Sequence, residues 1–160
     1  MRETMLLLER RIQDDLRTIE EIYRSLDATP LSSTASEETA IVAGYRLHNL
    51  YNAIENIFGS IAEAFENQLD DRSRWHRELL RRMTLDLLPV RPAVIDEHSY
   101  ELLDELLRFR HLFRAAYGIQ LDPERVVLVL RKAMELREPF ARQIEKFLDF
   151  VRGVQVEDGS

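Results

Sequence analysis

Apolar residues recur at intervals of three and four along most of this chain, which is the spacing of one face of an α-helix. The pattern predicts five helices, over residues 2–26, 36–67, 75–88, 96–117 and 123–151. The last of them is expected to kink before Pro139. No stretch alternates between apolar and polar residues as a strand would. Long helices with short connections indicate an all-α, up-and-down helical bundle of about five helices.

The length of the chain and the extent of the pattern suggest one domain. A chain of 160 residues with 45% hydrophobic content can bury a sizeable core without disulfides or metals. We therefore expect a single helical domain over residues 1–152 and a loose C-terminal tail over residues 153–160.

Composition narrows the possible chemistry. The chain has no cysteine, which removes disulfides, thiolate nucleophiles and Cys-ligated zinc. Its four histidines lie in different segments without the spacing of a ligand motif, so no metal site or cofactor is expected. The N-terminal apolar run is too short for a secretory signal, and no stretch approaches the roughly 18 apolar residues of a membrane span. A cytoplasmic protein without a membrane segment is the expectation.

The net charge of −7 and the pI of about 5.2 argue against non-specific binding of nucleic acid. Of the 22 basic residues, however, all except Lys132 and Lys146 are arginine, whose planar fork of donors suits phosphate and carboxylate groups. Arg74, Arg77 and Arg81 are spaced to share one helix face. That face is either a solvated surface or a local electrostatic path for RNA.

The fourth predicted helix changes character at its C-terminal end. Its core stripe consists of Leu102, Leu106, Phe109, Phe113 and Ala116. Beside this stripe Arg110, Arg114 and Tyr117 follow one line, while His111 and Ala115 form a pair on the more polar side. Arginines at a helix C-terminus complement its dipole. Forked cations beside apolar surface also suit a phosphate, and a histidine can move protons.

The stretch LRFRHLFRAAYG resembles the signature of HepT-like HEPN-domain ribonuclease toxins, which is Arg, four residues, His, one residue, Tyr. Arg110 and Tyr117 match the first and last positions, and Ala115 stands where the family has its histidine. The segments YRLHNLYNAIENIF, WHRELLRRM and RPAVI are also similar to family segments. The resemblance covers roughly Thr39 to Phe150.

The resemblance implies a homodimer with two motif helices facing each other across a cleft, and metal-independent cleavage of RNA, with tRNA as the expected target. Arg110, beside Arg114, would stabilise the charge that builds on the scissile phosphate. A histidine would act as acid or base while the ribose 2′-hydroxyl attacks. The implied partner is an MNT-type nucleotidyltransferase antitoxin that silences the toxin by transferring AMP to Tyr117.

Ala115 removes the usual proton carrier, so this chain is expected to be catalytically inactive, with His111 one turn away as a partial substitute. The intact remainder of the motif favours an introduced substitution over a natural loss. His48, Asn52 and Glu55 line one face of the second predicted helix. That face either borders the cleft, by family analogy, or is only a polar stripe; in the first case Glu55 would hold a motif arginine in place.

Two other functions stay open at this point. A non-enzymatic HEPN-type bundle would bind a nucleotidyltransferase or a nucleotide without cutting RNA. A plain helical dimer would use its arginines for packing alone.

Overall fold

The computed structural model describes residues 1–66, 75–115 and 121–158 of the chain. Its helices are α1 (Arg2–Asp27), α2 (Glu37–Glu66), α3 (Trp75–Arg82), α4 (Glu97–Ala115) and α5 (Pro123–Asp158). Within the described ranges the only β-type pairing is an isolated bridge between Leu87 and Arg91. Over the residues that the structure describes, the predicted all-α class and the five predicted helices are confirmed.

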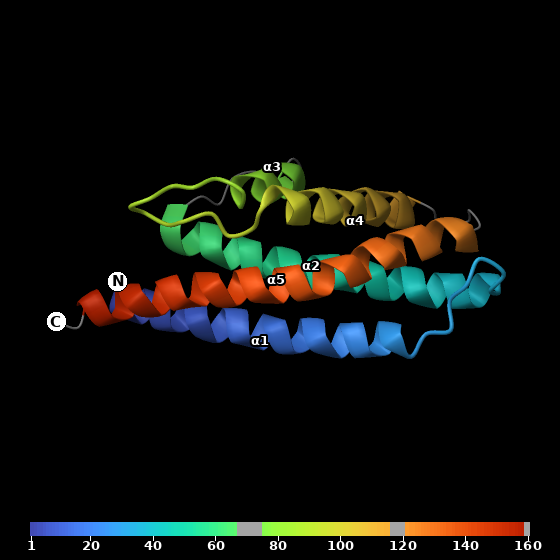
Figure 1. Cartoon of the computed structure of the whole chain (residues 1–160), viewed down its shortest axis with the longest axis horizontal. Helices are drawn as coiled ribbons and strands as arrows, with labels where there is room; N and C mark the ends of the chain where they lie inside the picture. Colours follow the sequence, from blue (N-terminus) through green and yellow to red (C-terminus); the bar gives the residue numbers. More distant parts are fainter. Residues whose placement is uncertain (67–74, 116–120, 159–160) are drawn as a thin grey trace.

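The four long helices lie side by side, and those that follow one another along the chain run in opposite directions (Figure 1). Both α1 and α4 pack against α2 and α5, and the short α3 packs against α2 and α4. The N- and C-termini lie together at one end of the bundle, and α4 ends at the other (Figure 1). This is the up-and-down bundle that the sequence predicts.

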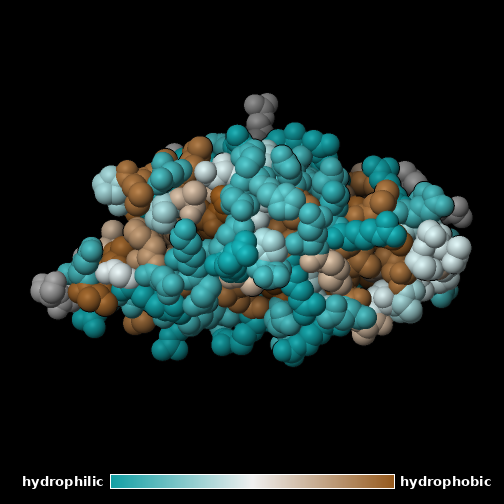
Figure 2. Space-filling view, viewed as in Figure 1, coloured by the Kyte–Doolittle hydropathy of each residue, from teal (hydrophilic) through white to brown (hydrophobic). Residues whose placement is uncertain are grey.

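Helix α2 is the most enclosed of the helices, because it contacts each of the other four. Its buried residues therefore occupy more than one face: Ala40, Ala43, Leu47, Leu50, Tyr51, Ala53, Ile54, Ile57, Phe58, Ile61 and Ala62. Hydrophilic residues cover most of the middle of the face seen in Figure 2, and hydrophobic ones gather towards its two ends.

Two helix ends differ from the sequence prediction. Helix α3 ends at Arg82 rather than at residue 88, and the chain turns there because the amides of residues 83–85 donate to carbonyls three residues earlier. Helix α5 passes Pro139 and continues to Asp158, so residues 153–158 are helical and not the expected loose tail. Gln155 donates to Glu9 of α1 at 3.0 Å, which anchors that last stretch.

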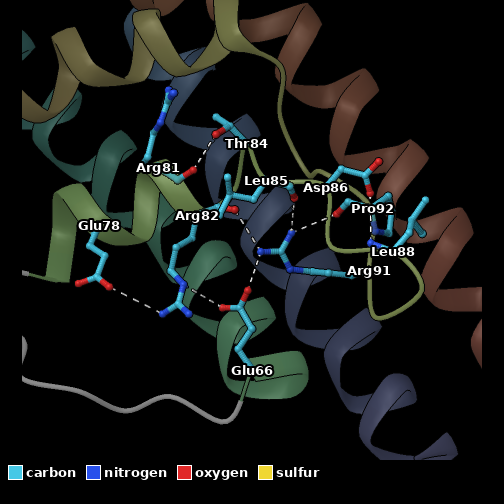
Figure 3. A network of polar contacts seen from close by, with 10 residues as sticks. All are labelled: Glu66, Glu78, Arg81, Arg82, Thr84, Leu85, Asp86, Leu88, Arg91 and Pro92. Atoms are coloured by element: carbon cyan, nitrogen blue, oxygen red, sulfur yellow. Dashed lines mark hydrogen bonds and ion pairs between the residues drawn. The ribbon is translucent and has the colours of Figure 1, made fainter.

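The connector between α3 and α4 is held by a fully buried arginine, Arg91 (Figure 3). Its Nη2 donates to the Glu66 carboxylate at 2.7 Å and to the Arg82 carbonyl at 3.1 Å. Its Nη1 donates to the carbonyls of Leu85 and Pro92, both at 3.1 Å. These bonds join the end of α2 to the end of α3, and so they help to place α3 over α2.

We expect Glu66→Ala to lower the free energy of unfolding by about 3 kcal/mol, because removing one partner of a buried ion pair leaves the other charge uncompensated. Urea denaturation of the variant and the parent measures this loss. Glu78→Ala is the control, since the Glu78 carboxylate is exposed and 4.0 Å from Arg82; its expected loss is below about 1 kcal/mol. Equal losses in the two variants would show that Arg91 does not depend on Glu66.

Candidate functional site

The C-terminal end of α4 lies directly against the N-terminal half of α2. A Cβ atom at Gly44 would lie 3.1 Å from the Phe113 ring, which is tighter than ordinary contact, so the missing side chain lets the two helices approach. One turn further along α2, the His48 ring meets the same Phe113 ring with centroids 5.6 Å apart. The polar residues of α2 are thereby placed beside the motif segment of α4.

Arg110 is the central residue of this contact and is only 7% exposed. Its Nε donates to Oδ1 of Asn52 at 2.8 Å, and the Asn52 amide nitrogen lies 3.1 Å from Nε2 of His48. The Nη1 atom is buried without a hydrogen-bond partner among the described residues, and no carboxylate there lies within ion-pair distance. Because an unpaired buried charge is strongly unfavourable, this guanidinium is suited to binding an anion.

A second polar group lies one turn along α2. The Nδ1 atom of His76, from α3, is 2.7 and 2.8 Å from the two carboxylate oxygens of Glu55. The His76 ring also meets the His111 ring of α4 edge-on, with centroids 6.3 Å apart. Since a carboxylate can only accept, Nδ1 carries the hydrogen, and in the neutral ring Nε2 is left as an acceptor.

The electrostatics keep the other two imidazoles of this region neutral. Burial, and after it the positive charges of Arg110 and Arg114, lower the pKa of His48. Burial and Arg110 likewise lower the pKa of His111. Burial raises the pKa of the Tyr51 phenol, whose hydroxyl has no hydrogen-bond partner in the described part of the chain. At neutral pH both imidazoles are therefore bases, and the phenol keeps its proton.

The structure brings Arg110, Asn52 and His48 together, but it gives Glu55 a different partner from the expected one. Glu55 does not hold a motif arginine; it pairs with His76, because α3 covers this part of α2 and carries that ring into hydrogen-bond distance. Asn52, one turn away, contacts Arg110 instead.

The remaining motif positions lie at the surface or beyond the described residues. His111, Arg114 and Ala115 are exposed on the last turns of α4. Ala116, expected in the core stripe, and Tyr117, expected to be modified, lie outside the described ranges.

The predicted basic face of residues 74, 77 and 81 is only partly described. Arg77 is exposed, and Arg74 lies outside the described residues. Arg81 bonds to Glu97 at 2.9 Å and lies 4.8 Å from the centre of the Tyr100 ring, so it joins α3 to α4. This contact favours a structural role for Arg81.

His76 is the site residue that sequence reasoning missed. The signal for His76 was indirect: Glu55 is a half-buried carboxylate on a helix rich in apolar residues, and such a carboxylate needs a partner. Nothing in the spacing along the chain points from Glu55 to a histidine on the next helix.

In the part of the chain that the structure describes, no three His, Cys, Asp or Glu side chains gather as a metal site would require. None of the helices described is sufficiently long and apolar to cross a membrane.

Fold and site together define an all-α bundle with a buried, incompletely paired arginine at the end of one helix. Residues 42–151 match the model of a family described as HepT-like protein. This match covers more than half of the chain, from α2 into α5, so the chain belongs to the HepT-like protein family, as its motif predicts. No curated protein and no solved structure matches the chain.

We expect Arg110→Met to leave the free energy of unfolding unchanged or to raise it by about 1 kcal/mol, because an apolar side chain of similar volume removes an unpaired buried charge. Urea denaturation is the measurement. Arg91→Met is the matched control. Because Arg91 has a carboxylate and three carbonyl partners, this substitution is expected to lower the free energy of unfolding by about 3 kcal/mol. A comparable drop for Arg110→Met would mean that Arg110 is a structural residue.

Proposed function

We propose that this chain is the cytoplasmic toxin component of a type VII-like HEPN/MNT toxin–antitoxin pair, and that its reaction is metal-independent cleavage of RNA, with tRNA as the target. The observation that carries the proposal is the buried Arg110 guanidinium, which occupies the motif arginine position and has an unpaired Nη1. Membership of the HepT-like protein family supports it.

The contact between Arg110 and Asn52 fits a phosphate-binding role. Asn52 accepts from Nε of Arg110 and so orients the side chain, while the buried Nη1 keeps its donor capacity unused by the described residues. Guanidinium donors that stabilise charge developing on the phosphate lower the barrier to its displacement. The proposed reaction is attack of the ribose 2′-hydroxyl on phosphorus, with departure of the 5′-oxygen.

The distribution of charge supports an RNA substrate despite the overall acidity. Arg77, Arg110 and Arg114 lie close enough to His111 to lower its pKa, so positive charge is concentrated at this end of α4. The protein as a whole has a net charge of −7. A local positive region of this kind attracts the phosphate backbone to one place on the surface.

The surface beside the site supports the proposed homodimer. Ile41, Val42 and Tyr45 on α2 are 44%, 44% and 58% exposed, and with Phe113 of α4 they line a groove next to the motif segment. Covering these residues with a second copy would bury apolar surface and bring two α4 ends towards each other.

We expect Ala115→His to cleave tRNA at least about 100-fold faster than the parent, because it restores a positioned acid–base group. Labelled tRNA incubated in EDTA and resolved on a denaturing gel measures the rate. The double variant Ala115→His, Arg110→Met is the control, and it should be folded but inactive.

A folded, dimeric Ala115→His protein that leaves RNA intact would overturn the ribonuclease proposal. In that case a non-enzymatic function is favoured, because residue 115 is alanine and the chain lacks the motif histidine. The alternative is a non-enzymatic HEPN-type bundle that binds a nucleotidyltransferase or a nucleotide.

The proposed regulation is transfer of AMP to Tyr117, whose position follows from the motif spacing. A phosphate added there introduces an anion next to the segment that carries Arg110 and Arg114, and so competes with RNA. After incubation with the MNT partner and ATP, peptide mass spectrometry is expected to find AMP on the Tyr117 peptide. Tyr117→Phe is expected to remain unmodified, and an adduct on any other peptide would rule out this site.

A further inference from the structure

The Glu55–His76 pair lies beside the site but has no part in the family motif. Comparison with the other His–Glu pair among the described residues shows how firmly it is held. His98 and Glu135 meet at 3.1 Å with side chains 56% and 50% exposed, whereas the His76 and Glu55 side chains are 23% and 15% exposed. His76 also lies within hydrogen-bond distance of both Glu55 oxygens. A half-buried carboxylate therefore holds Nδ1 of this imidazole.

The second ring nitrogen of His76, Nε2, is available to accept a proton. Nε2 of His76 makes no hydrogen bond to any described residue, and the side chain retains some exposure. An imidazole with a carboxylate behind Nδ1 and a free lone pair at Nε2 is the arrangement that proton-transfer sites use, because the carboxylate fixes the tautomer and stabilises the imidazolium that forms.

The pair also contacts the helix that carries Arg110. The His76 ring touches the ring of His111, which follows Arg110 in α4. The titratable groups in contact with His76 are Glu55 from α2 and His111 from α4. The charges that act on His111 come from Arg77 of α3 and from Arg110 and Arg114 of α4. His76 and the arginines both act on the pKa of His111, so all of them lie in one electrostatic neighbourhood.

We propose that His76, positioned by Glu55, is a proton carrier of this site and acts where the motif histidine is replaced by Ala115. The proposal rests on the RNA cleavage proposed above. Neutral Nε2 of His76 takes the proton of the ribose 2′-hydroxyl while the O2′–P bond forms and the P–O5′ bond breaks. The departing 5′-oxygen takes a proton from water, and the imidazolium returns its proton to solvent. The products are a 2′,3′-cyclic phosphate end and a 5′-hydroxyl end.

The test compares cleavage of labelled tRNA by the unaltered chain and its variants, in EDTA and at high protein concentration. The unaltered chain is expected to cleave slowly, and His76→Gln to reduce this rate about 100-fold. Glutamine can still donate to Glu55, and circular dichroism confirms that the variant is folded. His98→Gln and Glu135→Gln, which alter the exposed His–Glu pair, are the matched controls and leave the rate unchanged.

The pH profile separates proton transfer from a merely structural effect. The rate of the unaltered chain should rise with pH through the deprotonation of one group, because the base must be neutral to accept a proton. Glu55→Gln removes the charge behind the ring and should move the midpoint of that rise to lower pH. A slower but unshifted profile would show that Glu55 only supports the fold, and would overturn its positioning role.

The outcomes distinguish this inference from the proposed function. If Ala115→His cleaves RNA but the unaltered chain does not, or cleaves equally well with His76→Gln, the role of His76 is overturned and the ribonuclease assignment stands. If no variant cleaves RNA, Ala115→His included, the ribonuclease assignment fails and the role of His76 falls with it.

Discussion

Enclosure of α2 by the four other helices is the constraint on which the rest of the structure depends. A polar side chain on so enclosed a helix has little access to water and must find its partner on a neighbouring element. Asn52 meets Arg110 of α4, Glu55 meets His76 of α3, and Glu66 holds the buried arginine of the connector. These three polar positions of α2 thus connect it to α4, to α3 and to the connector between them.

The two buried arginines differ in how their charges are paired. Arg91 has a carboxylate and three carbonyls around its guanidinium, which join α2, α3 and the connector. Its Nε is buried without a hydrogen-bond partner in the described part of the chain, but its charge is paired with Glu66. Arg110 has one neutral amide oxygen and a buried, unpaired Nη1. Folding alone gives no reason to bury a cation in that state. The sequence alone does not tell a buried arginine that is paired with a carboxylate from one that is not.

Helical periodicity was sufficient to predict the bundle. The alignment of Arg110 beside a core stripe predicted its position at the border of the packed face, where the structure buries it. The errors arose where a distant side chain decides the local structure. Helix α3 stops at Arg82, and the carbonyl of Arg82 accepts a hydrogen bond from Arg91, nine positions later in the chain. The partner of Glu55 depends on which helix covers α2 at that level, and spacing along the chain carries no such information.

The motif positions of α4 differ in burial: Arg110 is buried and Ala115 is exposed. Arg110 belongs to the packed contact between α2 and α4, where any change alters the helix interface. Ala115 is on the exposed side of the last turn, where the choice of side chain does not disturb packing and alanine is the best helix former. A proton carrier at this edge need only reach the substrate, so it can come from another helix. Glu55 and His76 meet that requirement, because α3 brings an oriented imidazole to the same end of α4.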